Sequence, residues 1–195
     1  MATAGQTVFN PVTKERITFL ETAADTNGER ITIRLELPAE GAVPGTHVHP
    51  EQYETFHVIS GRMKFRYGLK KIVAGPGETV VVPPGVVHDF RTEGDEDVVV
   101  DVVVEPALDM EELFATAVAL AEEGHVTKKG MPKPVHLALF VERFHREAAA
   151  PFPPAAVVRF LFAPLRAYGR RAGHAERYGI PAKRRARRFN RPATA

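Results

Sequence analysis

The stretch THVHPEQYETFHVISG, residues 46–61, decides the fold because it places three histidines and two glutamates in a segment with strand periodicity. His47 and His49 are two residues apart. On an extended strand, alternate side chains share a face, so both imidazoles can point into the protein while Val48 points away. Pro50 is expected to end this first strand.

A second strand is predicted to begin near Tyr53. On it Glu54 shares a face with Phe56 and Val58, whereas His57 has the opposite parity. The carboxylate of Glu54 can therefore complete a site with the two histidines, and His57 is expected to lie outside it. Glu51 lies in the intervening turn, from which it could reach the outer shell of the site.

A fourth ligand is predicted further along the chain. The segment GETVVVPPGVVHDF, residues 77–90, reads as a strand followed by a Pro-Gly turn, and His88 stands at the start of the next strand. Three imidazole nitrogens and one carboxylate suit one divalent transition metal, which could be Fe, Mn, Ni, Cu or Zn. The chain has no cysteine, so thiolate ligands and disulfides are excluded. The predicted metal ligands are His47, His49, Glu54 and His88.

These two segments resemble the paired sequence motifs of the cupin superfamily. The residues that match the first motif are Gly41, His47, Val48, His49, Glu54 and Gly61. Those that match the second are Gly77, Pro83, Pro84, Gly85 and His88. Thr92 stands where the family often has Asn, which is not a ligand. The resemblance covers roughly residues 7–105 and implies a single-domain cupin of the type-2 conserved-barrel kind, with a metal on the four ligands named above.

The periodicity of the chain agrees with an all-β fold followed by helices. Residues 30–37 alternate as a half-buried strand, and residues 53–59 and 62–67 read as a hairpin about a Ser-Gly turn. The β-branched runs at 78–85 and 97–105 read as further strands. Together with the resemblance, this predicts an antiparallel cupin β-barrel of the jelly-roll type with a C-terminal helical extension.

Three helical segments follow the last strand. Residues 108–124 begin with Asp109 and Glu112, the spacing of a capping box, and end at a glycine. Residues 133–150 read as a second helix, and residues 155–171 as a third one that is kinked at Pro164. The histidines of this region are expected to be surface or satisfied core residues; they are His125, His136, His145 and His174.

We therefore predict three regions. Residues 1–106 form the barrel, and residues 107–180 form the helical extension, packed on the barrel or on the partner in a homodimer. Residues 181–195 form a basic and disordered tail.

Charge is divided unevenly along the chain. Residues 166–195 carry ten Lys or Arg and one Glu, a net charge of +9, so the other 165 residues carry −7 of the total of +2. The tail alone does not make nucleic acid an expected partner, because no aromatic-rich basic face accompanies it. Contact of the C-terminal segment with a membrane surface is the less favoured alternative to protein packing. The N-terminus has no signal-peptide pattern, and we expect a cytoplasmic protein.

The reaction is left open between three classes. A metal-dependent oxygenase of the dioxygenase type is favoured, with Glu54 as both ligand and proton acceptor. The alternatives are a non-catalytic small-molecule binder or sensor and a metal-dependent isomerase or lyase. A small apolar or aromatic substrate is expected, since the predicted pocket residues share the parity of the ligands: Phe56, Val58, Met63, Phe65 and Phe90.

Overall fold

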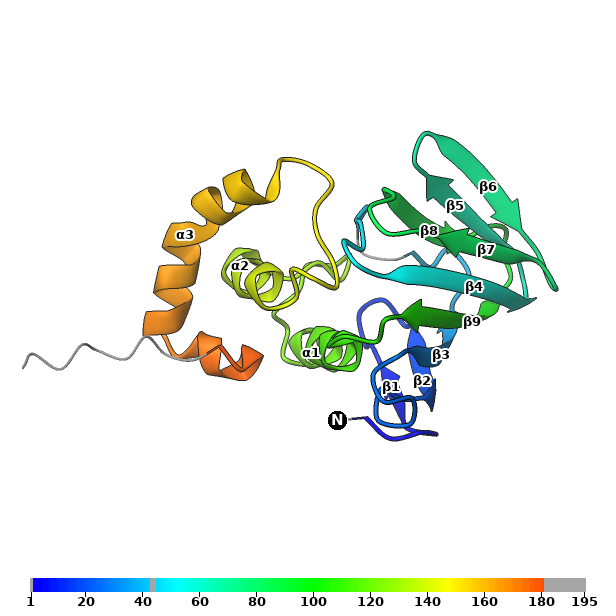
Figure 1. Cartoon of the computed structure of the whole chain (residues 1–195), viewed down its shortest axis with the longest axis horizontal. Coiled ribbons are helices and arrows are strands. Elements are labelled where there is room, and N and C mark those ends of the chain that lie inside the picture. The colour runs from blue at the N-terminus through cyan, green and yellow to red at the C-terminus, as the bar shows by residue number, and fades with distance from the viewer. Residues whose placement is uncertain (1, 43–44, 181–195) are drawn as a thin grey trace, which may run out of the picture.

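The computed structural model describes residues 2–42 and 45–180, which fold into two antiparallel sheets and three α-helices (Figure 1). The larger sheet has six strands, in the order β1 (Thr7–Phe9), β2 (Arg16–Glu21), β3 (Ile31–Leu37), β9 (Val98–Glu105), β4 (Tyr53–Ser60) and β7 (Thr79–Val82). The smaller sheet has three strands, in the order β6 (Lys70–Ala74), β5 (Met63–Tyr67) and β8 (His88–Thr92). The helices are α1 (Met110–Glu122), α2 (Pro134–Arg143) and α3 (Ala155–Arg171), followed by the short 3₁₀ helix η1 (His174–Tyr178).

The core lies between the two sheets and follows from strict alternation along the strands. In β3 every second side chain is buried, beginning with Ile31 and ending with Leu37. β9 alternates in the same way and pairs with β3 over its whole length. Phe56 of β4 and Phe65 of β5 are fully buried and meet edge to face, with ring centroids 5.0 Å apart. The predicted half-buried strand at 30–37 is thus confirmed.

The predicted hairpin between residues 53–59 and 62–67 was wrong. β4 pairs with β7 and β9, whereas β5 pairs with β6 and β8, so the Ser60–Gly61 turn carries the chain from one sheet to the other. Gly61 has a φ of +72°, and a Cβ built on it would lie 2.5 Å from the carbonyl oxygen of Asp97. The turn is therefore a corner packed against the start of β9. Period-two alternation locates strands but does not say which strands pair.

The segment before β4 attaches to the smaller sheet. His47 exchanges two backbone hydrogen bonds with His88, of 3.0 and 2.9 Å, and Ala42 forms a bridge to Arg91. The backbone N–H and the hydroxyl of Thr92 both donate to the carbonyl of Gly41, at 2.9 and 3.3 Å. The structure shows these antiparallel sheets; closure into a complete barrel stays a prediction.

The helices lie on one side of the sheets, as Figure 1 shows, and all of them follow β9. The division into a β domain and an extension stays a prediction, and the predicted basic tail lies outside the described residues. In the part of the chain that the structure describes, no helix is long and apolar enough to cross a bilayer.

Two details of the helices differ from the sequence prediction. Asp109 is the N-cap of α1 but makes no side-chain capping bond, because its carboxylate accepts a hydrogen bond from Arg143 at 2.7 Å. α2 ends at Arg143 instead of continuing to residue 150. Residues 144–150 form a non-helical strap, with consequences described below. α3 continues through Pro164, and Figure 1 shows its axis bending along its length.

A second core joins the ends of the helices. Leu120 of α1, Leu139 of α2 and Tyr178 of η1 are buried together. The imidazole of His136 is buried among them, bonds the hydroxyl of Tyr178 at 2.9 Å and stacks on His125 at 4.1 Å. His136 is thus a satisfied core residue, as the sequence analysis expected.

The corner at Gly61 gives a test of the fold. Gly77 also has a positive φ, of +82°, but a Cβ there would meet no atom within 4 Å. Gly77→Ala is therefore expected to cost only about 1–2 kcal/mol of unfolding free energy for the left-handed conformation. Gly61→Ala adds a clash with backbone, and we expect it to cost at least about 1 kcal/mol more. Urea unfolding followed by circular dichroism measures both, and equal losses would contradict the packed corner.

Candidate metal centre

Three elements bring the four predicted ligands together. His47 and His49 lie on the segment that precedes β4, Glu54 is the second residue of β4, and His88 is the first residue of β8. One ligand atom from each of the four lies within 4.8 Å of the others. Glu54, His49 and His88 are buried, and His47 is partly exposed. The cluster is therefore able to bind a metal ion and is reached from the side of His47.

Each imidazole of the cluster has its Nδ1 committed to a backbone carbonyl. The Nδ1–H of His47 donates to Gly45 at 3.2 Å, that of His49 to Glu147 at 2.5 Å, and that of His88 to Val86 at 3.0 Å. A carbonyl oxygen only accepts, so these bonds fix the proton on Nδ1. In the neutral imidazoles each Nε2 then carries a lone pair, and Nε2 is the atom available to a metal.

The carboxylate of Glu54 stands against two of these nitrogens. Its Oε2 lies 3.0 Å from Nε2 of His88 and 3.2 Å from Nε2 of His49. Burial alone would raise the pKa of Glu54, but the two imidazoles outweigh burial and hold that pKa well below its usual range. Burial opposes protonation of His49, yet the neighbouring carboxylate of Glu54 prevails and raises the pKa of His49. Partial burial, with the charges of His88 and His49, lowers the pKa of His47 to about 4.

This arrangement fits a divalent transition metal. A lone pair on Nε2 beside a carboxylate oxygen is repulsive unless a proton or a cation lies between them. The Nε2 of His49 is buried and has no hydrogen-bond partner among the described residues. Buried nitrogens rarely stay without a partner, so this atom is a good candidate ligand for a metal. Three nitrogens and one oxygen are ligands that Fe, Mn, Ni, Cu and Zn all accept.

The structure also places the two neighbours of the cluster. His57 is exposed on the outer face of β4 and bonds the hydroxyl of Thr79 at 3.0 Å, as its strand parity predicted. Glu51 is exposed and pairs with the guanidinium of Arg146 at 2.7 and 3.0 Å. It does not contact the four ligands directly. Its link to the cluster runs through the strap that holds Arg146.

The five predicted pocket residues all lie in the hydrophobic core, and their side chains are between 0% and 7% exposed. Phe90 is the most exposed of them at 7%, and its ring meets Phe56 edge to face at 5.0 Å. Contact of any of them with a substrate stays a prediction. The five are Phe56, Val58, Met63, Phe65 and Phe90.

The strap contacts the cluster and could not be predicted from the sequence. Val48 and Ala149 exchange two backbone hydrogen bonds of 2.9 Å, so the strap pairs with the strand segment that carries His47 and His49. This pairing brings the carbonyl of Glu147 to Nδ1 of His49. Helical periodicity through residues 133–150 concealed the strap, and no motif in the sequence marks it.

The side chain of Glu147 anchors the strap from the other side. It is 2% exposed, and its Oε1 accepts a hydrogen bond from the backbone N–H of Asp109 at 3.1 Å. The strap is thus held at the start of α1, at Val48 and at Glu51. The orientation of His49 therefore depends on the helical extension as well as on its own strand.

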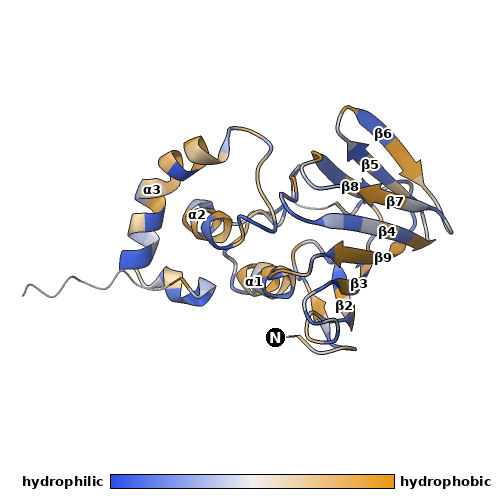
Figure 2. Cartoon of the chain, in the orientation of Figure 1, coloured by the Kyte–Doolittle hydropathy of each residue, from blue (hydrophilic) through white to orange (hydrophobic). Residues whose placement is uncertain are grey.

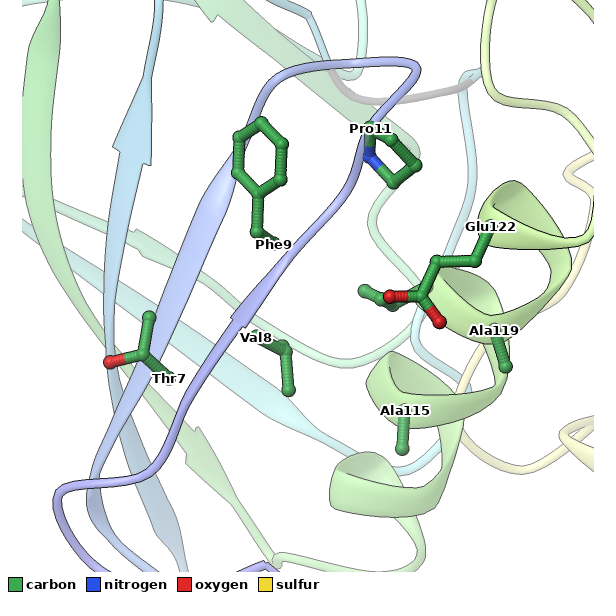
Figure 3. A pocket seen from close by; sticks show the side chains of 8 residues that line it. Thr7, Val8, Phe9, Pro11, Ala115, Ala119 and Glu122 are labelled. Atoms are coloured by element: carbon green, nitrogen blue, oxygen red, sulfur yellow. The ribbon is translucent and has the colours of Figure 1, made fainter.

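A separate groove of about 390 Å³ lies between β1 and α1 (Figure 3). Its lining is mostly apolar, with Phe9 and Val8 on one side and Ala115 on the other, and Glu122 is its only titratable residue. None of the four clustered ligands lines it.

The ligand assignment can be tested by substitution. In apo protein, His49→Ala and His88→Ala are each expected to weaken Zn²⁺ or Ni²⁺ binding more than about 100-fold. Loss of a residue that only supports a ligand typically weakens metal binding by less than this. His57→Ala is the matched control from the opposite face of β4 and should bind as wild type does. Isothermal titration calorimetry measures the affinities. Binding that survives both ligand variants unchanged would show that the metal sits elsewhere.

The metal affinity is also expected to fall as the pH is lowered. The raised pKa of His49 lets a proton compete for Nε2, and the metal must displace it. Titrations in two buffers of different ionisation enthalpy should show proton release on binding. Affinity that is constant between pH 8 and pH 5 would contradict imidazole ligation.

The strap gives a separate prediction. Ala149→Pro removes the N–H that bonds Val48, and we expect it to lower metal affinity about 10- to 100-fold through the lost support of His49. Ala150→Pro is the control, since residue 150 is exposed and outside the bridge. Both variants should keep the circular dichroism of the wild type. Equal metal affinity in the two variants would show that the strap does not position the site.

The part of the chain that carries the cluster resembles a known protein family. A family model described as "Cupin domain" matches residues 34–105, which contain all four ligands. No curated protein matches the chain.

Solved structures with a similar fold cover about half of the chain. The cupin domain of Cnp3 from Schizosaccharomyces pombe is 12% identical, with a TM-score of 0.44, and covers 52% of this chain and 71% of that one. A predicted oxalate decarboxylase from Thermotoga maritima is 20% identical, with a TM-score of 0.46, and covers 53% and 92%. A sugar phosphate isomerase of the cupin superfamily from Silicibacter pomeroyi is 19% identical, with a TM-score of 0.42, and covers 47% and 59%. None of these likenesses carries over to the reaction of this chain.

The matched residues hold both sequence motifs and every clustered ligand, and the strands they form are arranged in antiparallel sheets. Residues 34–105 are therefore a cupin domain.

Proposed function

We propose that this cupin is a metal-dependent oxygenase that acts on a small apolar or aromatic molecule. The observation that carries the proposal is the cluster itself, in which three Nδ1-anchored imidazoles and one buried carboxylate converge within 4.8 Å. Four protein ligands leave open positions on a metal that prefers six.

The four residues of the cluster would hold the metal, and the chain supplies the rest. When bound, the metal would provide Lewis acidity and, for Fe, Mn, Ni or Cu, one-electron chemistry with dioxygen. Glu54 is held ionised by His49 and His88, so its carboxylate can accept a proton from the hydroxyl of a substrate. Burial of His49, Glu54 and His88 keeps water from most of the site, which strengthens these interactions.

Two features support a small apolar substrate. Access is from the side of His47, the partly exposed ligand. Phe56 and Phe90 follow Glu54 and His88 by two residues on their strands, so strand alternation turns each aromatic ring to the same side as the ligand before it. Both rings are buried, and if substrate binding uncovers them, such a lining would suit an aromatic or apolar molecule better than a highly charged one.

A metal-dependent isomerase or lyase is the second candidate. The ionised carboxylate of Glu54 favours it, because a buried base beside a metal can move a proton without any change in redox state. Zn²⁺ would support that reaction, whereas it would not support oxygenation.

Oxygen consumption separates the two. We expect protein loaded with Fe, Mn, Ni or Cu to consume dioxygen with at least one member of a panel of flavonols, catechols and β-diketones. Zn-loaded protein and His88→Ala should show no uptake above background. A Clark-type electrode measures the uptake, and mass spectrometry with ¹⁸O₂ measures incorporation.

The remaining outcomes also decide between the classes. Substrate conversion without oxygen uptake, by Zn-loaded protein, would replace the oxygenase by an isomerase or lyase. Saturable binding of a panel member without conversion under any metal would make the protein a binder or sensor and contradict both enzymes.

A further inference from the structure

α3 has two apolar stripes, and only one of them is covered. The covered stripe ends at Gly169, which is buried against Val135 and Leu139 of α2, and the residues in line with it at helical spacing are partly buried: Val158, Phe162 and Leu165. The second stripe, called here the outer stripe of α3, is Val157, Phe160, Leu161 and Tyr168. These side chains are 42%, 79%, 58% and 59% exposed, respectively.

The position of α3 explains this exposure. α3 packs on α2 and η1 and stands on the side of the helices away from the two sheets, as Figure 1 shows. In Figure 2, hydrophobic and hydrophilic residues alternate along α3. An exposed row of large apolar side chains on one helix face marks an interaction surface, since such rows are costly to leave in water.

The charge around the outer stripe is of one sign. α3 contains four arginines and no acidic residue. Arg166 and Arg170 turn to Glu142 of α2, whereas Arg159 and Arg171 are exposed. The chain continues with further cations, so that residues 166–195 carry a net charge of +9.

This charge decides between the two partners that an apolar stripe could take. If two copies of the chain paired through their outer stripes, the exposed Arg159 and Arg171 of both copies would meet with no acidic residue of α3 to offset them, and this repulsion opposes the pairing. An anionic bilayer surface offers an apolar layer for Phe160 and Leu161 and negative headgroups for the arginines. No described helix could span the bilayer, so the contact would be at its surface.

We propose that the outer stripe of α3, together with the exposed Arg159 and Arg171 of the same helix, binds the surface of anionic phospholipid bilayers. α3 would lie in the interfacial plane with Phe160 and Leu161 inserted among the acyl chains. This inference does not depend on the metal cluster or on the proposed oxygenase.

Vesicle cosedimentation of the full chain tests it. We expect the protein to bind vesicles of 70% phosphatidylcholine and 30% phosphatidylglycerol at 0.1 M NaCl, and to bind pure phosphatidylcholine at least about 10-fold more weakly. The variant Phe160→Ala/Leu161→Ala should reduce partition to the anionic vesicles at least about 10-fold, because two exposed side chains no longer insert. Leu69→Ala is the matched control, since Leu69 is fully exposed in the β5–β6 turn, and it should bind as wild type does.

Three results would overturn the proposal. Binding to anionic vesicles that is unchanged in Phe160→Ala/Leu161→Ala would show that positive charge alone, without the outer stripe, makes the contact. Equal binding to the two kinds of vesicle would exclude a role for anionic headgroups. A dimer in sedimentation equilibrium that the double variant dissociates, without vesicle binding by the wild type, would make a second copy of the chain the partner.

Discussion

The pairing of His47 with His88 is the interaction on which the centre of this molecule depends. Two backbone hydrogen bonds between these residues join the segment before β4 to the first residue of β8. Through them two motifs that lie far apart in the sequence share one short ladder, and their imidazoles face the same space as Glu54. His49 shares the face of His47 by strand alternation, and Glu54, the second residue of β4, completes the set from the other sheet.

Backbone carbonyl groups orient the imidazoles of the cluster toward a bound cation. Each of the three imidazoles gives its Nδ1–H to a carbonyl, which leaves three Nε2 atoms to meet around one carboxylate. Burial and the neighbouring imidazoles lower the pKa of His47, whereas the carboxylate of Glu54 raises the pKa of His49 against the effect of burial. Binding of a metal by these groups would release the protons that they share, so metal affinity and protonation are coupled.

The helical extension takes part in this orientation of the imidazoles. The strap at 144–150 forms a strand pair with Val48 and supplies the carbonyl that fixes His49. Glu147 ties the same strap to the start of α1, and Arg146 ties it to Glu51. α1 and α2 are therefore coupled to the metal cluster, whereas α3 projects beyond them with its outer stripe exposed.

Much of the fold and the site could be predicted from the sequence, because local rules govern both. Alternation along residues 30–37 and 53–59 located β3 and β4, and the parity of Glu54 against His57 separated the ligand candidate from its neighbour. What failed was non-local. The hairpin about Gly61 was wrong because the packing of that glycine on Asp97 turns the chain into another sheet. The strap was missed because the sequence of residues 144–150 has the periodicity of a helix. In the structure Ala149 of this segment instead forms backbone hydrogen bonds with Val48, which is far away in the sequence.

The central claim is that one metal sits among the four clustered side chains, and anomalous scattering tests it most directly. A crystal of the protein, grown with the metal it carries on purification, would be measured above and below the absorption edge of that metal. We expect a single anomalous peak per chain, bonded to Nε2 of His47, His49 and His88 and to a carboxylate oxygen of Glu54. A peak at any other place, or a metal bonded through Nδ1 of these histidines, would contradict it.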